Sequence, residues 1–527
     1  MNLWYLFRTQ SFRISTMINN GYRENLPLLN KKQKNIIISS FLGINYAKSV
    51  ENKFRWSTSS VKKFVIRHNN TLGFVAPQLL QPNDLLTGMS LNQPEIIQHE
   101  QCLNLNVYSP DKMGKLPVMV WIHGGGFQVG SGSLPAYEGK KLAQSAKVVV
   151  VSLNYRLGAL GFLRLCDITD GAINSTGNEG LGDQITALKW IQQNINNYGG
   201  NNNNITIFGE SAGAMSIACL LASPAAKGLF HKAILQSGAS HTYSSVDKAN
   251  NVAKEFINSA NALGFTTKDL TSMSTNDILS VQQHFLKRPD IYKKFGILPF
   301  SPVVEKDLLP LPPHDAIKKG CAKDIVLLAG TNTDEWTLFA AMTGQNLKTV
   351  DSVQLSLQGL MASSLIENCL QLAEKALTDR SRTITPQNSL NEVLSEYWFT
   401  QPCHRLLANH KLSGGRNYRY KLGRRTIIEA LGCTHVTDIG FVFGHTEKTL
   451  HGTETRVDEL ITQIQASWSA FAHTGEPSTD TIQWPIYGLD NELHYIYFDH
   501  QSTYIDKHTI DNVRFWSQIS DQQLADF

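Results

Sequence analysis

The fold of this chain is decided by the stretch Phe208-Gly209-Glu210-Ser211-Ala212-Gly213-Ala214, which places a serine between two glycines directly after the apolar run at 205–208. The pattern G-x-S-x-G is typical of a sharp strand-to-helix turn, in which the serine hydroxyl projects clear of a sheet. The following helix directs its free N–H groups and positive end at the same place, which favours a negatively charged oxygen there. The pattern is short, and it needs support from its context before Ser211 is taken as a nucleophile.

A second glycine-rich turn follows another apolar segment, at 116–122, and reads His123-Gly124-Gly125-Gly126-Phe127. In enzymes built around a G-x-S-x-G turn, an H-G-G-G loop and the residue after the nucleophile supply the N–H groups that bind an oxyanion. The expected donors are Gly125, Gly126 and Ala212. A phosphate-binding loop is the alternative interpretation, but no Gly-Lys-Ser/Thr follows and the spacing is not G-x-G-x-x-G.

A nucleophilic serine needs a histidine to accept its proton and a carboxylate to orient that histidine. The apolar segment 325–330 predicts a buried parallel strand, and Asp334 and Glu335 follow its carboxyl end, where open α/β sheets place their sites. Either acid could serve. His435 lies in a predicted loop before the apolar segment 439–443, although a lone loop histidine is more often merely solvated.

From about residue 41 to residue 516 the chain resembles the type-B carboxylesterase and cholinesterase family of α/β-hydrolases. The segment 41–47 reads FLGINYA and resembles the family's F-x-G-I-P-Y-A, while 100–106 reads EQCLNLN and resembles E-D-C-L-x-L-N. Further matches precede the serine turn at 154–191 and close the chain at 468–485. The resemblance implies an α/β-hydrolase fold: a mostly parallel central sheet with helices on both faces and helical insertions over the catalytic end.

Carried over position by position, the family's nucleophile falls on Ser211, its base on His435, and its acid on Glu335 rather than Asp334. The oxyanion donors fall on the amides already named. The resemblance also implies supporting and substrate-pocket residues. The supporting residues are Glu210 beside the nucleophile and Ser237 with Asp438 behind the histidine, and the pocket residues are Gly296, Leu298 and Leu338.

These assignments imply hydrolysis of small-molecule carboxylic esters through an acyl-enzyme intermediate, with no metal or organic cofactor. A catalytically silent binding or adhesion protein is the alternative from another class, because this fold also serves cell-surface recognition. The presence of all three triad residues favours the enzyme. A lipase, thioesterase or amidase remains open, because the same triad serves all acyl transfers.

Three departures from the family pattern bear on the substrate. Gln101 stands where the family has Asp, which leaves the packing of that loop in doubt. The segment 83–98 contains no tryptophan to stack on a quaternary ammonium, so choline esters are not the expected substrates. Gly296 and Leu298 stand in place of bulky aromatics, which predicts a wider acyl pocket.

The remaining sequence predicts an N-terminal extension at 1–35 and one α/β-hydrolase domain at 36–520. Strands are expected at 147–153, 232–236, 417–422 and 493–498, and helices at 179–195 and 456–473; the stretches 252–285 and 350–412 also look helical. The net charge of +4 is too diffuse to indicate nucleic-acid binding. The apolar run at 3–7 is too short for a signal peptide or a membrane span.

The cysteines indicate where the protein works. All seven, Cys102, Cys166, Cys219, Cys321, Cys369, Cys403 and Cys433, lack the partners that secreted relatives use for disulfides. We therefore expect seven reduced thiols and a cytoplasmic protein, with secretion as the alternative. A monomer or a weak homo-oligomer is expected.

Overall fold

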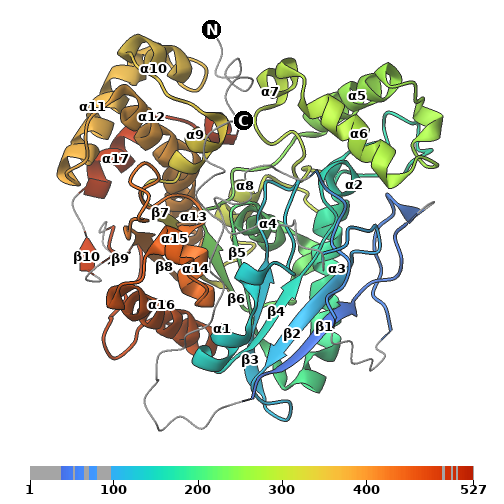
Figure 1. Cartoon of the computed structure of the whole chain (residues 1–527), viewed down its shortest axis with the longest axis horizontal. Helices are drawn as coiled ribbons and strands as arrows, with labels where there is room; N and C mark the ends of the chain where they lie inside the picture. Colours follow the sequence, from blue (N-terminus) through green and yellow to red (C-terminus); the bar gives the residue numbers. More distant parts are fainter. Residues whose placement is uncertain are drawn as a thin grey trace.

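The computed structural model describes residues 37–51, 54–63, 71–79, 96–488, 493–499, 503–505 and 508–525. Its centre is a sheet of ten strands in the order β1-β2-β4-β3-β5-β6-β7-β8-β9-β10 (Figure 1). The strands are β1 (Ser39–Asn45), β2 (Asn104–Ser109), β3 (Leu116–Ile122), β4 (Val149–Leu153), β5 (Gly200–Glu210), β6 (Lys232–Gln236), β7 (Val326–Asn332), β8 (Asn417–Leu422), β9 (Tyr495–Phe498) and β10 (Thr503–Ile505).

Neighbouring strands are parallel from β4 through β9 and antiparallel at both edges of the sheet. The sheet is therefore mostly parallel, as the sequence predicts. Parallel strands are buried on both faces and read as nearly continuous apolar runs, as β4 and β6 do. The predicted strands at 232–236 and 417–422 coincide with β6 and β8, and the other two predicted strands begin two residues later than expected.

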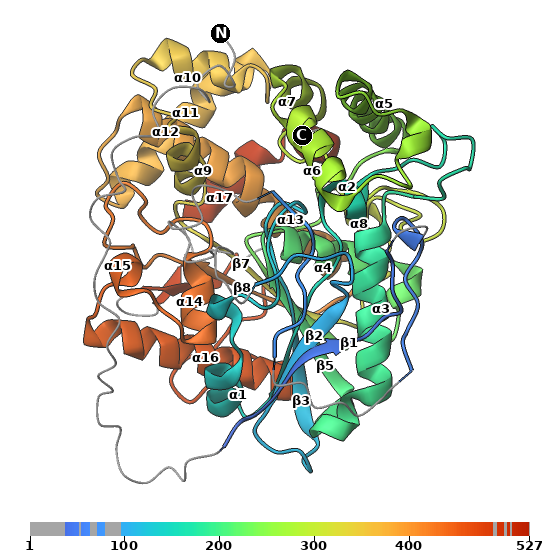
Figure 2. The same ribbon diagram turned by 45° about the vertical axis from the view of Figure 1, so that its right-hand side comes forward.

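Helices cover both faces of the sheet (Figures 1 and 2). One face packs against α1 (Lys140–Ala146), α14 (Thr437–Phe443) and α16 (Thr455–Thr474). The other face packs against α3 (Glu179–Asn194), α4 (Ala212–Ala222), α8 (Pro313–Lys318) and α13 (Gln401–Leu412). Two buried apolar clusters fill these interfaces, and the predicted helices match α3 and α16 to within one residue at each end.

Two helical lobes extend from the sheet at the end toward which the carboxyl ends of the parallel strands point, at the top of Figure 1. One lobe consists of α5 (Val246–Ala262), α6 (Thr275–Leu286) and α7 (Pro289–Phe295). The other consists of α9 (Thr337–Thr343), α10 (Val350–Leu357), α11 (Ser363–Asp379) and α12 (Pro386–Ser395), with its own buried cluster. A π-helical turn, Glu396–Thr400, joins α12 to α13. The remaining α-helices are α2 (Gly158–Phe162), α15 (Lys448–His451), α17 (His508–Trp516) and α18 (Asp521–Ala525).

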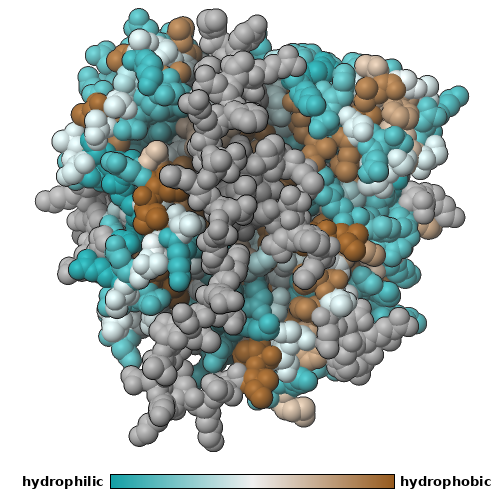
Figure 3. Space-filling view, in the orientation of Figure 1, coloured by the Kyte–Doolittle hydropathy of each residue, from teal (hydrophilic) through white to brown (hydrophobic). Residues whose placement is uncertain are grey.

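Figure 3 shows how hydrophobic side chains are distributed over the described residues that are visible from this side. Hydrophobic residues lie there in separate groups among hydrophilic ones. Within the part of the chain that the structure describes, the helices fall short of the length and hydropathy that a membrane span requires.

Candidate active site

Ser211 occupies the turn between β5 and α4 in a strained backbone conformation, with φ 54° and ψ −125°. Its amide donates to the carbonyl of Gln236 at 2.9 Å, which ties the turn to β6. A Cβ atom on Gly209 would lie 2.6 Å from the carbonyl oxygen of Ile122, and one on Gly213 would collide with the same oxygen. Only glycine fits on either side of the serine, and Ser211 is half-buried between buried neighbours.

The glycine-rich loop after β3 packs directly against this turn. A Cβ atom on Gly124 would lie 2.8 Å from a carboxylate oxygen of Glu210. Within the described residues, the amides of Gly125, Gly126 and Ala212 donate to no other group of the protein. These three N–H groups are therefore free to bind an oxygen atom beside Ser211.

Glu335 is fully buried just beyond the end of β7, and three groups hold its carboxylate. Oε1 accepts hydrogen bonds from the Asn332 amide and the Ser237 hydroxyl, both at 2.6 Å. Oε2 lies 2.6 Å from Nδ1 of His435. Because the carboxylate cannot turn without breaking these contacts, it fixes the orientation of the imidazole.

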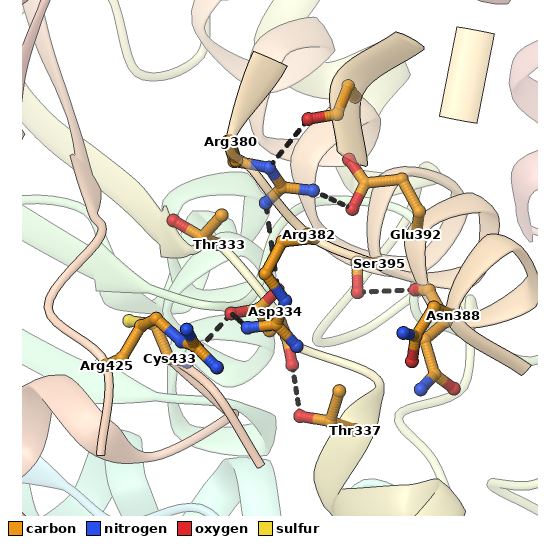
Figure 4. A network of polar contacts seen from close by, with 12 residues as sticks. Thr333, Asp334, Thr337, Arg380, Arg382, Asn388, Glu392, Ser395, Arg425 and Cys433 are labelled. Atoms are coloured by element: carbon orange, nitrogen blue, oxygen red, sulfur yellow. Dashed lines mark hydrogen bonds and ion pairs between the residues drawn. The ribbon is translucent and has the colours of Figure 1, made fainter. Parts of the chain in front are cut away.

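Asp334, the other acid that the sequence left open, faces away from His435. Its Oδ2 accepts a hydrogen bond from the Cys433 amide at 2.8 Å, and the side chain lies between Arg380 and Arg382 (Figure 4). Of the two adjacent acids, the structure brings Glu335 alone into contact with the histidine.

His435 is buried between aromatic rings and carboxylates. The centroids of Phe339 and Phe399 lie 5.2 Å and 4.8 Å from the imidazole centroid. Nε2 lies 2.9 Å from Oε1 of Glu210, the residue before Ser211, at ion-pair distance but without the alignment of a hydrogen bond. Nε2 therefore faces the carboxylate of the residue that precedes Ser211, and among the described contacts no hydrogen bond joins Nε2 to the Ser211 hydroxyl.

Charges within this site determine its protonation. Burial lowers the pKa of His435, but the carboxylates of Glu210 and Glu335 outweigh that effect and raise the pKa above its ordinary value. Burial raises the pKa of Glu210, and it also raises the pKa of Asp438. The site thus stabilises a positive charge on the imidazole more strongly than water does.

The two residues expected behind the histidine are both buried close to the site. Ser237 hydrogen-bonds Glu335 and reaches His435 through it. Asp438 accepts hydrogen bonds from the Gln236 amide at 2.9 Å and from the Tyr420 hydroxyl at 2.8 Å. Among the described contacts, neither residue hydrogen-bonds His435 itself.

The three expected pocket residues, Gly296, Leu298 and Leu338, differ in how directly they adjoin the site. Leu298 lies beside the glycine loop, since its Cδ2 would be 3.3 Å from a Cβ atom on Gly126. Gly296 ends α7 with φ 74°. Leu338 is buried on α9, next to the Phe339 that packs on His435.

The sequence reasoning missed Phe339 and Phe399, the two rings against the histidine. Phe339 lies four residues after Glu335. Side chains at this spacing share one face of a helical turn, so the sequence could have indicated that Phe339 lies near the site. Phe399 lies on the π-helical turn, and no motif marks it.

Two further expectations concern other loops. Gln101 is exposed and donates a hydrogen bond to Glu51, while the adjacent Glu100 forms a buried ion pair with Arg55 at 2.7 Å. The segment 83–98, where no tryptophan was found, lies mostly outside the described residues, and the predicted extension at 1–35 lies entirely outside them.

Comparison with known proteins gives consistent matches. Residues 28–516 match the model of the carboxylesterase family. The chain is 34% identical over 459 residues to the para-nitrobenzyl esterase of Bacillus subtilis (strain 168), covering 85% of this chain and 89% of that protein. It is 30% identical to a cholinesterase of Mus musculus, over 91% of this chain and 83% of that protein.

Solved structures agree with these matches. A thermophilic PNB esterase superposes with a TM-score of 0.77 at 32% identity, covering 92% of this chain and 97% of that one. A second PNB esterase gives a TM-score of 0.76 at 31% identity, covering 92% and 96% of the two chains.

Proposed function

The chain belongs to the carboxylesterase family and is a carboxylic-ester hydrolase, and from this premise we propose that Ser211, His435 and Glu335 form its catalytic triad. The observation that carries the proposal is the 2.6 Å contact between Glu335 Oε2 and His435 Nδ1, beside a serine held in a strained turn. This contact keeps the proton on Nδ1 and leaves Nε2 to act as a base.

In the proposed reaction, His435 Nε2 takes the proton of the Ser211 hydroxyl as its oxygen attacks the ester carbonyl. The carbonyl oxygen becomes an oxyanion and accepts hydrogen bonds from the amides of Gly125, Gly126 and Ala212. The ester C–O bond then breaks, and the alcohol leaves with the proton from His435. Water repeats the sequence on the acyl-enzyme, releases the acid and restores Ser211.

Glu210 has a supporting part in this mechanism. Its carboxylate oxygen lies 2.9 Å from Nε2, the atom that becomes protonated during attack. It therefore stabilises the imidazolium form of His435, at the cost of making the neutral base less populated.

The proposed substrates are small carboxylic esters. One relative is named a para-nitrobenzyl esterase, which supports aryl and benzyl esters as probes. Choline esters are proposed to be poorer substrates, on the sequence of 83–98. Cytoplasmic localisation and a monomeric or weakly associated state remain proposals from the sequence.

The experiment that tests the triad uses hydrolysis and covalent labelling together. The wild-type protein should hydrolyse p-nitrophenyl butyrate and be labelled by an organophosphonate, whereas Ser211→Ala should lose both. Loss of a triad member costs roughly 10⁴ to 10⁶ in rate. A matched control is Ser216→Ala, one turn further along α4, where the hydroxyl accepts a hydrogen bond from Gln184 at 3.0 Å.

The control variant should keep labelling and turnover. Labelling of Ser211→Ala, or near wild-type hydrolysis by it, would contradict the assignment. A wild-type protein that neither hydrolyses nor reacts would favour the silent binding protein. Thioester, anilide and long-chain glyceride substrates in parallel separate the thioesterase, amidase and lipase alternatives.

A further inference from the structure

Asp334 joins the two loops that carry Glu335 and His435. Its amide donates to the carbonyl of Cys433 at 2.9 Å, and its Oδ2 accepts from the amide of Cys433 at 2.8 Å. Asp334 thus forms hydrogen bonds with both the backbone N–H and the backbone carbonyl of Cys433. Glu335 follows Asp334 directly, and His435 lies two residues beyond Cys433.

Neighbouring contacts strengthen the same junction. The Asn332 side chain donates to the Thr434 carbonyl at 2.9 Å. The Thr337 hydroxyl contacts the carbonyl oxygens of Asp334 and Leu431, both at 2.6 Å. Both loops are therefore held together on either side of the Asp334 contact.

The carboxylate of Asp334 also faces two cations from the α9–α12 lobe. Arg380 Nη1 lies 3.7 Å from Oδ1, and Arg382 Nη1 lies 3.7 Å from Oδ2. Arg380 in turn pairs with Glu392 of α12, and Figure 4 shows the cations and Cys433 around the same carboxylate. The side chain of Asp334 is 8% exposed. A carboxylate so removed from water requires compensating charge, which the arginines supply.

The loop approaches this carboxylate as closely as a glycine permits. Gly432 has φ 62°, and a Cβ atom there would collide with Oδ2 of Asp334. The position before Cys433 is therefore shaped around the aspartate. This close approach leaves little freedom for the two loops to slide past each other.

We propose that Asp334, held by Arg380 and Arg382, is a positioning residue that keeps Glu335 and His435 in register. The inference rests on the proposed triad. Asp334 contacts none of the reacting groups; it acts through the backbones on which they are carried. Misplacement of a catalytic group by about 1 Å costs on the order of 100-fold in rate, so a junction two residues away has a large effect.

The test separates the hydrogen bond of Asp334 from its charge. Asp334→Asn keeps an oxygen for the Cys433 amide and loses the charge, while Asp334→Ala loses both. With p-nitrophenyl butyrate we expect kcat to fall about 10-fold for Asn and about 100-fold for Ala, with KM nearly unchanged. Because a loosened Glu335 stabilises the imidazolium less, the acid limb of the kcat/KM profile should move to lower pH in the alanine variant.

A matched control is Asp183→Asn. Asp183 is fully buried and pairs with Arg156 at 2.7 Å, and none of its described contacts reaches either loop. The Asp183→Asn variant should have a lower Tm, while kcat of the folded enzyme and the pH profile of kcat/KM stay unchanged. A third variant, Arg382→Gln, leaves both hydrogen bonds between Asp334 and Cys433 in place. It should therefore lower kcat less than Asp334→Ala does.

All rates are normalised to active sites counted with the organophosphonate. If both Asp334 variants keep wild-type kcat and pH profile per active site, or change only in Tm as Asp183→Asn does, the positioning role is wrong. Should Asp334→Ala fail to fold, the asparagine variant decides by the same criterion. Absence of labelling in the wild type would instead overturn the triad itself, so the two failures are distinguishable.

Discussion

Glu335 Oε2 lies 2.6 Å from His435 Nδ1, while the second oxygen of the same carboxylate is occupied by the Asn332 amide and the Ser237 hydroxyl. The carboxylate therefore has one orientation available. That orientation is set by residues at the ends of β6 and β7, before any substrate is present. It makes the acid a rigid support for the imidazole.

The first prediction follows from this support. Glu335→Gln should lower kcat by about 10⁴, because the amide permits the wrong tautomer of His435. Far-UV circular dichroism should be unchanged. Asp334→Asn should cost much less, and the opposite ranking of the two variants would move the acid role to Asp334.

A second prediction concerns pH. Glu210 raises the pKa of His435, and a general base works only in its unprotonated form. Below the pKa of His435 the base is protonated and the rate falls, so removing the charge in Glu210→Gln should move the acid limb of kcat/KM to lower pH. Measuring kcat/KM against pH for the wild type and for Glu210→Gln tests this prediction. An acid limb that stays in place or moves to higher pH in the variant would contradict the role given to Glu210.

The acyl pocket provides a third prediction. If the pocket is widened where Leu298 adjoins Gly126, butyryl and hexanoyl esters should be accepted at least as well as acetyl esters. Each buried methylene contributes about 0.8 kcal/mol. Leu298→Phe should reduce kcat/KM for the hexanoyl ester more than for the acetyl ester. A steep wild-type preference for acetyl would show that the pocket is narrow.

The fourth prediction concerns the cysteines, all seven of which are free in the structure. Titration of the denatured protein without reductant, after isolation under alkylating conditions, should find seven thiols. In the native protein only Cys321 and Cys166, the two cysteines with solvent-accessible surface, should react. They should react slowly, because partial burial of each sulfur raises the pKa of both thiols. Two or more missing thiols would argue against a reducing compartment.

The sheet was predictable where its strands are buried on both faces. β6 and β8 were located to the residue: β6 has the apolar centre 233–235 between Lys232 and Gln236, and β8 alternates polar residues with Tyr418, Tyr420 and Leu422. The residues alone could not decide between Asp334 and Glu335. Both acids follow the end of the same strand, and which of them faces His435 depends on how the two loops fold against each other. The family resemblance indicated Glu335, and the contact with His435 supports it.

Phe399 illustrates what local patterns cannot reveal. Its ring reaches His435 from a π-helical turn inside a continuous helical segment, where one extra residue per turn changes which side chains face the site. Pro402 lies just beyond and has no N–H to donate back along the helix, which was the one local sign of an irregularity.

Four neighbouring strands, β5 through β8, each lead into one residue of the site: Ser211, Ser237, Glu335 and His435. Because β8 begins at Asn417, more than two hundred residues after the serine, the site is completed late in synthesis. On the proposed triad, a nascent chain that has already formed the serine turn still lacks its base, and we expect it to have no esterase activity. On the proposed triad, we expect the serine to become a working nucleophile only after the loop that carries His435 has emerged from the ribosome and β8 has joined the sheet.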